Sequence, residues 1–336
     1  MKLFFVNRTL STISDGEAKI LQDIKGEILA KDYIEEVIYP EVADAIIIQE
    51  DSSTYKGFRY IKELESDPIT FAYPEKVFTI NTDDSATGLL RGLYTGLPRS
   101  RFNPRIYKSV PYMYFPNELA FSQATDDFTP TFLASWRGNA KSNSIRKRMI
   151  DLLIDDDRFC IQMTDSWLNH KEDEKLRYVD LIRSSKFSLC PAGWAPVSFR
   201  IYESMALGRC PVIIADNFVP PKGPKWRDFA LFYQERKISG LSSYLLKNEH
   251  LAFNLGYKAL EAWNNYFGAA VIKQYYANAL VSLIKLAPKT TRETEIKRWR
   301  SFKLQWDNKW TISQRALNRL NKIVGKYKHP FRKEHP

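Results

Sequence analysis

The chain has few residues of the kinds that build metal centres and disulfide frameworks. Its 336 residues include 3 cysteines and 4 histidines. Cys160, Cys190 and Cys210 lie inside apolar runs, and neither they nor the scattered histidines have the spacing of metal ligands. We therefore interpret the cysteines as buried thiols in a reducing compartment, and we expect no zinc site.

Long apolar runs are also missing. No run approaches the roughly 20 residues that a membrane-spanning helix needs, and the start, MKLFFVNRTL, is too short and too polar for a signal peptide. Residues 2–6 fit better as the first strand of a sheet. We therefore expect a cytoplasmic protein, with attachment to the inner face of the cell membrane as an option for its C-terminal tail.

Net charge is absent from most of the chain. Residues 1–284 hold 35 basic and 35 acidic side chains, whereas residues 285–336 hold 15 Lys and Arg against 4 Asp and Glu. The formal charge of +11 therefore lies entirely in the tail. Apolar residues recur there at helical spacing in two stretches: Ile296, Trp299, Phe302, Trp306 and Trp310, then Ile312, Ala316, Leu317, Leu320, Ile323, Val324 and Tyr327.

Two interpretations of this tail remain open, and they are compatible. A basic helix with interfacial tryptophans suits an anionic membrane surface. Alternatively, the helices pack back on the protein, or the first packs and the second contacts lipid. Nucleic-acid binding is disfavoured, because no recognisable nucleic-acid module accompanies the basic residues.

The most informative segment is residues 186–221, which predicts a strand, a turn, a helix, a strand and a loop. An apolar run over 186–190 ends in Pro191-Ala192-Gly193, a turn signal. Apolar residues then recur at helical spacing over 197–207, and Gly208 ends the helix. A second buried strand over 211–214 completes a βαβ unit. In open sheets of such units, ligands bind beyond the carboxyl ends of the strands.

Arg200 and Glu203 make this unit a candidate site. A helix N-terminus attracts anions, so a cation in its first turn is unfavourable unless an anion neutralises it. Arg200 therefore suggests a phosphate-bearing ligand, and Glu203, on the same helix face, could accept both hydroxyls of a ribose. The alternative is an ordinary Arg–Glu pair on a solvated face.

These residues resemble the signature of the exostosin-like glycosyltransferases, glycosyltransferase family 47, and most closely that of its bacterial members. The family patterns S-K-F-x-L-C-P-x-G, S-x-R-x-x-E, G-x-x-P-V-I-I and D-x-x-V-P-P are found here, in order, at residues 185–193, 198–203, 208–214 and 216–221. The resemblance implies a GT-B fold of the α/β class, with two Rossmann-like domains facing across a cleft. It also implies transfer of a sugar from a nucleotide-sugar with inversion at the anomeric carbon.

A weaker resemblance precedes this core. Residues 132–138 predict a strand that ends in a glycine turn, and Ser144-Ile145-Arg146 opens a helix, as in the family's F-x-G segment followed by I-R. The loop over 139–143 is rich in small hydrogen-bond donors and could receive phosphate. It could equally be an ordinary βα loop with an Asn or Ser helix cap.

An inverting transferase needs a base to deprotonate the acceptor hydroxyl. Asp83 follows a strand predicted over 76–80 and is our first candidate, with Asp84 next; we expect the acceptor to enter past Asp83 and Arg91. Glu50 and Asp51, which follow another predicted strand, are competitors. Alternatively, the aspartates cap turns.

A superficial metal motif, Asp155-Asp156-Asp157, follows a predicted helix and more simply ends it on the surface. We expect the diphosphate to be neutralised by a helix N-terminus and by Arg200, Arg137 and Arg146. Catalysis would then require no metal and no cofactor besides the donor.

The sequence thus predicts an acceptor domain over 1–125, a nucleotide-sugar domain over 126–285 and a basic helical tail over 286–336, with irregular structure over 88–116. The predicted function is transfer of a sugar, UDP-linked, to a glycan or lipid-linked glycan in surface polysaccharide synthesis. The alternatives are a non-catalytic glycan- or nucleotide-binding protein and a fucosyltransferase-like enzyme using a GDP-sugar. The expected catalytic residues are Asp83 and Arg200, and the expected donor-site residues are Arg137, Gly138, Arg146, Gly193, Ser198, Phe199, Arg200, Glu203 and Asp216.

Overall fold

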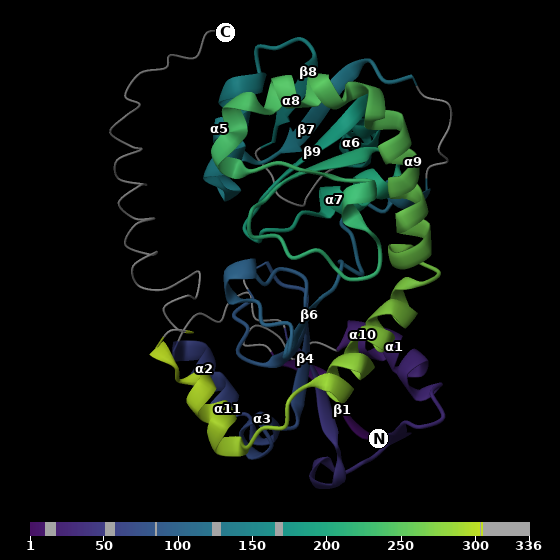
Figure 1. Cartoon of the computed structure of the whole chain (residues 1–336). Coiled ribbons are helices and arrows are strands. Elements are labelled where there is room, and N and C mark those ends of the chain that lie inside the picture. The colour runs from purple at the N-terminus through teal and green to yellow at the C-terminus, as the bar shows by residue number, and fades with distance from the viewer. Residues whose placement is uncertain are drawn as a thin grey trace.

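The chain forms two parallel β-sheets, one in each half. The computed structural model describes residues 1–10, 18–50, 58–84, 86–122, 129–164, 171–302 and 304. In Figure 1 the two sheets lie in separate lobes, one above the other. All described strand pairs in both sheets are parallel, as strands that alternate with helices predict.

The first sheet has the strand order β2-β1-β3-β4-β5-β6. Successive apolar residues of its strands point to opposite faces of the sheet. Ile47 packs with α1 and α10 (Ile272–Leu286), whereas Ile46 and Ile48 pack with α2 and α11 (Arg292–Trp299). A sheet covered on both faces needs such continuous apolar strands. The strands are β1 (Lys2–Leu10), β2 (Glu35–Glu36), β3 (Ala45–Glu50), β4 (Val77–Asn81), β5 (Arg91–Tyr94) and β6 (Tyr107–Ser109), and the helices are α1 (Lys19–Leu29), α2 (Phe58–Ser66) and α3 (Pro68–Ala72). The short helix α4 (Leu119–Ser122) comes next in the chain and packs against the second domain.

The second sheet has the order β11-β10-β9-β7-β8. The central strand β9 and its neighbour β10 are buried along nearly their whole length, which fits the apolar runs from which they were predicted. The strands are β7 (Phe132–Gly138), β8 (Phe159–Met163), β9 (Ser185–Pro191), β10 (Cys210–Ile214) and β11 (Leu231–Phe232), and the helices are α5 (Ser144–Leu153), α6 (Glu172–Arg183), α7 (Phe199–Ala206), α8 (Leu241–Asn248) and α9 (Ala252–Ala262). The predicted α/β class with two Rossmann-like domains is confirmed.

The last two described helices of the chain pack on the first domain. After a π-helical turn at Trp263–Phe267, α10 (Ile272–Leu286) leaves the second lobe and packs beside α1, as Figure 1 shows. α11 (Arg292–Trp299) then places Trp299, which is fully buried, against the other face of the first sheet. The predicted segment 126–285 therefore includes a helix that completes the core of the first domain.

The structure describes only the first part of the basic tail. In its first stretch, Ile296 and Trp299 of α11 pack on the protein, as one of the two interpretations held, and Phe302 is exposed. Trp306 and Trp310 of the same stretch lie outside the described residues. The apolar stripe over 312–327 lies outside the described residues, so membrane contact through it stays a prediction. Among the described residues, no helix is long and apolar enough to cross a bilayer.

Candidate functional site

A cleft of about 570 Å³ lies between the two domains, at the carboxyl ends of β4, β7 and β9. Parallel sheets bind ligands at this edge, because loops and helix N-termini gather there. The cleft brings together all the predicted site residues except Asp216: Asp83, Arg137, Gly138, Arg146, Gly193, Ser198, Phe199, Arg200 and Glu203.

Helix α7 positions Arg200. Ser198 caps the helix by accepting a hydrogen bond from the main-chain N–H of Arg200, at 3.4 Å. The Arg200 guanidinium donates to the main-chain oxygen of Arg137, and its carbon lies 5.7 Å from the ring centre of Trp136 and 5.4 Å from that of Tyr178. Its Nε has no hydrogen-bond partner in the described chain. A buried guanidinium held in this way favours an anion in the cleft.

Arg146 forms a second, partly buried cation beside the first. Its Nε donates to the Ala192 oxygen and its Nη1 to the Asn139 oxygen, both at 3.0 Å, and its guanidinium lies 5.8 Å from the ring centre of Trp136. Burial, and then the positive charge of Arg200, lower the pKa of Arg146 to about 10. It remains charged at neutral pH, and two neighbouring cations form a site for a multiply charged anion.

Gly193 has no side chain that would overlap the Arg146 guanidinium. A Cβ at this position would lie 2.9 Å from Nη2 of Arg146. A Cβ on Gly138 would likewise lie 3.1 Å from the Trp136 ring and 3.5 Å from Nη2 of Arg200. Both glycine turns therefore allow the main chain to approach the two guanidinium groups closely.

Glu203 is 4% exposed and accepts a hydrogen bond from the Tyr178 hydroxyl. Burial raises the pKa of the carboxyl, while the Tyr178 hydrogen bond and the charge of Arg200 oppose that rise. The burial of both Arg200 and Glu203 excludes the alternative of an ion pair on a solvated face. A carboxylate at the wall of the cleft is suited to accept hydroxyl hydrogen bonds.

The loop over 139–143 lies at the same sheet edge as Gly193, as expected. Asn139 accepts from the N–H of Lys141 at 2.7 Å, and Asn143 accepts from that of Ile145 at 3.1 Å. The Asn143 amide also donates to the Gly193 oxygen at 3.0 Å. The helix-capping interpretation is thus confirmed, and the caps fix the loop beside the cleft, which Asn139 lines.

Asp83 and Asp84 face these groups from the first domain. Both follow β4 and line the cleft. Asp84 accepts a hydrogen bond from the Tyr112 hydroxyl at 2.8 Å, and its charge acts on Arg146 across the cleft. The main-chain N–H of Asp83 donates to the Asn81 side chain at 2.9 Å. Two carboxylates therefore stand opposite two guanidinium groups.

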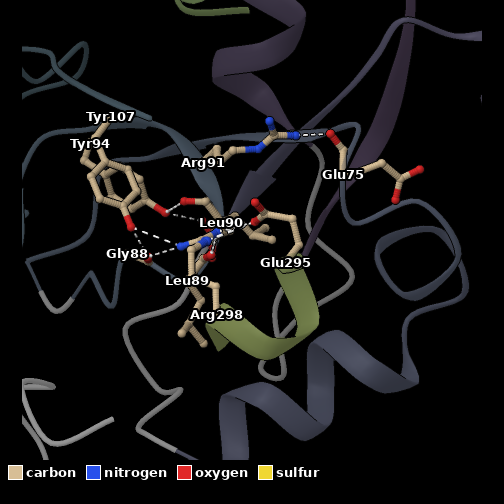
Figure 2. Close-up of polar contacts among 10 residues, drawn as sticks. Glu75, Gly88, Leu89, Leu90, Arg91, Tyr94, Tyr107, Glu295 and Arg298 are labelled. Atoms are coloured by element: carbon tan, nitrogen blue, oxygen red, sulfur yellow. Dashed lines mark hydrogen bonds and ion pairs between the residues drawn. The ribbon is translucent and has the colours of Figure 1, made fainter. Parts of the chain in front are cut away.

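Of the two competing base candidates, Glu50 does not line the cleft. Glu50 is 3% exposed, and burial raises its pKa to about 8. Asp51 lies outside the described residues. Arg91, expected on the acceptor route, is 3% exposed and donates to the main-chain oxygen of Glu75 near α11, as Figure 2 shows.

Asp216 is the donor-site prediction that the structure does not place in the cleft. Its N–H donates to the Glu235 carboxylate at 2.9 Å, and its own carboxylate accepts from the Glu235 N–H at 3.2 Å. The loop that follows turns away, because Arg99 of the first domain donates from its N–H to the Asn217 oxygen at 2.9 Å. This loop thus joins the domains instead of lining the cleft.

Sequence reasoning missed several residues of the cleft. Tyr178 and Glu174 enter it from α6, and Tyr112 from the segment after β6. None belongs to a local motif, so only the folded arrangement identifies them. The aspartates 155–157 lie elsewhere, where Asp156 pairs with Arg158 at 2.6 Å. Within the described residues, no group of three or more His, Cys, Asp or Glu could hold a metal ion.

A match to a known family covers every residue that lines the cleft except Ile20. The model of the exostosin GT47 domain matches residues 81–247, about half of the chain. The chain is 47% identical over 77 residues to "Probable glucuronoxylan glucuronosyltransferase IRX7" of Arabidopsis thaliana, covering 22% of this chain and 16% of that protein. It is 36% identical over 75 residues to "Probable beta-1,4-xylosyltransferase IRX10" of the same plant, covering 22% and 18%. The matches thus span less than a fifth of these relatives' length.

Solved structures give weaker likenesses. The crystal structure of TarM has a TM-score of 0.43 at 9% identity, covering 80% of this chain and 59% of that chain. The crystal structure of Anabaena HepE in complex with UDP has a TM-score of 0.41 at 11% identity, covering 84% and 100%. Likenesses of this size carry no argument about activity.

Proposed function

The chain belongs to the exostosin-like glycosyltransferases of family 47, and from that premise we propose that it transfers a sugar from a nucleotide-sugar to a glycan acceptor with inversion at the anomeric carbon. The observation that supports this most strongly is the interdomain cleft. It sets Arg146, Arg200 and Glu203 of the second domain opposite Asp83 and Asp84 of the first. A GT-B enzyme needs this division between donor and acceptor sides.

The donor nucleotide lies, in this proposal, along the edge of the second sheet. Its diphosphate sits between the N-terminus of α7 and the guanidinium groups of Arg200 and Arg146, where charge-assisted hydrogen bonds are strongest. Glu203 accepts the ribose hydroxyls. As the sugar leaves, negative charge develops on the diphosphate, and the two fixed cations stabilise it without reorganisation. We therefore propose that the reaction needs no divalent metal.

The acceptor hydroxyl attacks the anomeric carbon from the side of the first domain. Asp83 takes the hydroxyl proton as general base, while the bond from the anomeric carbon to the diphosphate breaks and the electron pair leaves with the diphosphate. Asp84 is the next candidate. It accepts a hydrogen bond from the Tyr112 hydroxyl at 2.8 Å. Neither residue has to bind the donor.

The donor is proposed to be UDP-linked. The relatives are named as glucuronosyl- and xylosyltransferases, so UDP-glucuronate and UDP-xylose are the first donors to test. A glycan or lipid-linked glycan of surface polysaccharide synthesis is the proposed acceptor. The protein would act in the cytoplasm, with its basic tail on the inner membrane face.

Substitution of each aspartate separates the roles. We expect Asp83→Asn to leave UDP affinity unchanged and to stop transfer, because the amide cannot accept the proton. Asp84→Asn, which keeps the shape of the site, is the matched comparison and should retain more activity. Glu203→Ala should weaken UDP binding instead. The measurements are isothermal titration with UDP and mass-spectrometric detection of glycan products. Normal turnover by the Asp83 variant would remove it as the base, and a GDP preference would contradict the proposed donor.

A further inference from the structure

A second cavity, of about 650 Å³, lies between the domains and shares no lining residue with the cleft. Its walls are β6, the loop over 219–223 and α10, the helix that passes from one lobe to the other in Figure 1. Two hydrogen bonds hold the loop in place. Ser109 donates from its hydroxyl to the Val219 oxygen at 2.6 Å, and Tyr275 donates to the Lys222 oxygen at 2.7 Å. The cavity is therefore a built feature of the domain junction.

Two lysines give this cavity a positive charge. Lys108 and Lys222 line it, and its described lining contains no Asp or Glu. Burial lowers the pKa of Lys108, and the positive charge of Lys222 lowers it further. Neither ammonium group makes a hydrogen bond or ion pair with any described residue. Two neighbouring cations without a carboxylate between them favour an anionic ligand group.

The remaining lining offers groups that recognise a sugar. Amide side chains of Asn265, Gln274 and Asn278 can donate and accept hydrogen bonds with hydroxyl groups. The Asn278 oxygen already accepts from Lys31 at 2.8 Å, which leaves its amide N–H groups to donate. The ring of Tyr266 adds an apolar face for sugar C–H groups. A mostly apolar cavity of this size with a few polar groups is typical of a small-ligand site.

We propose that this cavity binds an anionic saccharide, with Lys108 and Lys222 holding its carboxylate or phosphate group and the amides and Tyr266 holding the sugar ring. Because the walls come from both domains and from α10, the ligand would favour the domain arrangement seen here. The proposal does not depend on the chemistry of the cleft, from which the cavity is separate.

Titration of the full chain with matched probes tests this site. Trigalacturonate should bind, and its methyl ester, which has the same backbone without the charge, should bind at least about tenfold more weakly. Glucose 6-phosphate tests a sugar phosphate, and inorganic phosphate tests the anion alone. Lys108→Ala and Lys222→Ala should each weaken binding of the acidic probes by about tenfold, since one charge-assisted hydrogen bond is lost. Lys225→Ala, at an exposed position just after this loop and outside the cavity, should change nothing.

Three results would overturn the proposal. The first is absence of binding by both trigalacturonate and glucose 6-phosphate. The second is that the Lys108→Ala/Lys222→Ala double variant still binds the acidic probes with unchanged affinity. The ligand would then bind elsewhere, for example between the arginines of the cleft. The third is equal affinity for inorganic phosphate and glucose 6-phosphate, because the sugar ring would then contribute nothing to binding. Thermal melting of each variant confirms that it remains folded.

Discussion

Replacing Arg200 with methionine should separate ligand binding from folding. The guanidinium is buried, makes one hydrogen bond to the Arg137 oxygen and lies near the like charge of Arg146. Methionine keeps the unbranched apolar stem. The variant loses that hydrogen bond and the attraction between Arg200 and the buried Glu203 carboxyl, but it also loses the repulsion between Arg200 and Arg146. Because these changes oppose one another, we expect the free energy of unfolding to change by no more than about 1 kcal/mol. A diphosphate would lose charge-assisted bonds of about 1.5 to 3 kcal/mol, which weakens its affinity by about 10- to 150-fold.

The assay combines isothermal titration with UDP and urea denaturation of the ligand-free protein. Arg148→Met removes the same charge from an exposed position on α5 outside the cleft, and it controls for the change in net charge. UDP affinity of the Arg200→Met protein within twofold of that of the Arg148→Met protein would refute the assignment. A loss of several kcal/mol of stability with unchanged UDP affinity would show that Arg200 is structural.

Three further changes test other parts of the molecule. Gly193→Ala should displace the Arg146 guanidinium, which is the flexible end of its side chain, and should lower UDP affinity by about tenfold with little change in melting temperature. Glu50, with its pKa raised from 4.5 to about 8, holds a proton that the unfolded chain releases, so it contributes stability below about pH 4.5 that is lost as pH rises toward 8. Between pH 5 and 8, the unfolding free energy of the unchanged protein should therefore fall by up to about 1.4 kcal/mol per pH unit more than that of the Glu50→Gln variant. Plots of unfolding free energy against pH that run parallel for the two proteins over this range would contradict this. Trp299→Ala should cost about 3 to 5 kcal/mol of stability in urea, whereas Phe302→Ala, at an exposed position, should cost less than about 0.5 kcal/mol; equal effects would mean that α11 does not dock as described.

The second domain was predictable because its signals are local. The strands expected over 186–190 and 211–214 are β9 and β10, and the helix expected over 197–207 contains α7. Each has a strong apolar pattern and a Gly or Pro at its boundary, so the chain itself marks the ends. Sheet geometry then placed the candidate site residues at these ends, and the resemblance to family 47 favoured a ligand role for Arg200 and Glu203 over an ordinary ion pair.

The domain junction was not predictable in the same way. The expected irregular segment over 88–116 holds β5 and β6, which are too short to show a periodic pattern. Within β5, a Cβ on Gly92 would lie 2.1 Å from the Thr79 oxygen, so the glycine allows close approach of two strands instead of marking a turn.

Long-range packing explains the remaining differences. The amphipathic pattern of α10 shows that one face is buried, but not that the partner is the first sheet, whose last strand ends more than 150 residues earlier. Asp216 follows a strand at the expected edge, yet the contact of its loop with Arg99 directs that loop toward the first domain. Both outcomes depend on contacts between segments far apart in the chain.

The most direct test of the donor site is a titration of the full chain with UDP, GDP, CMP and ADP in the presence of EDTA. The account predicts that UDP binds selectively without metal, and that Glu203→Ala and Arg200→Met each weaken this binding. Failure of every nucleotide to bind, or UDP binding that both variants retain, would contradict the claim that the interdomain cleft holds a nucleotide-sugar.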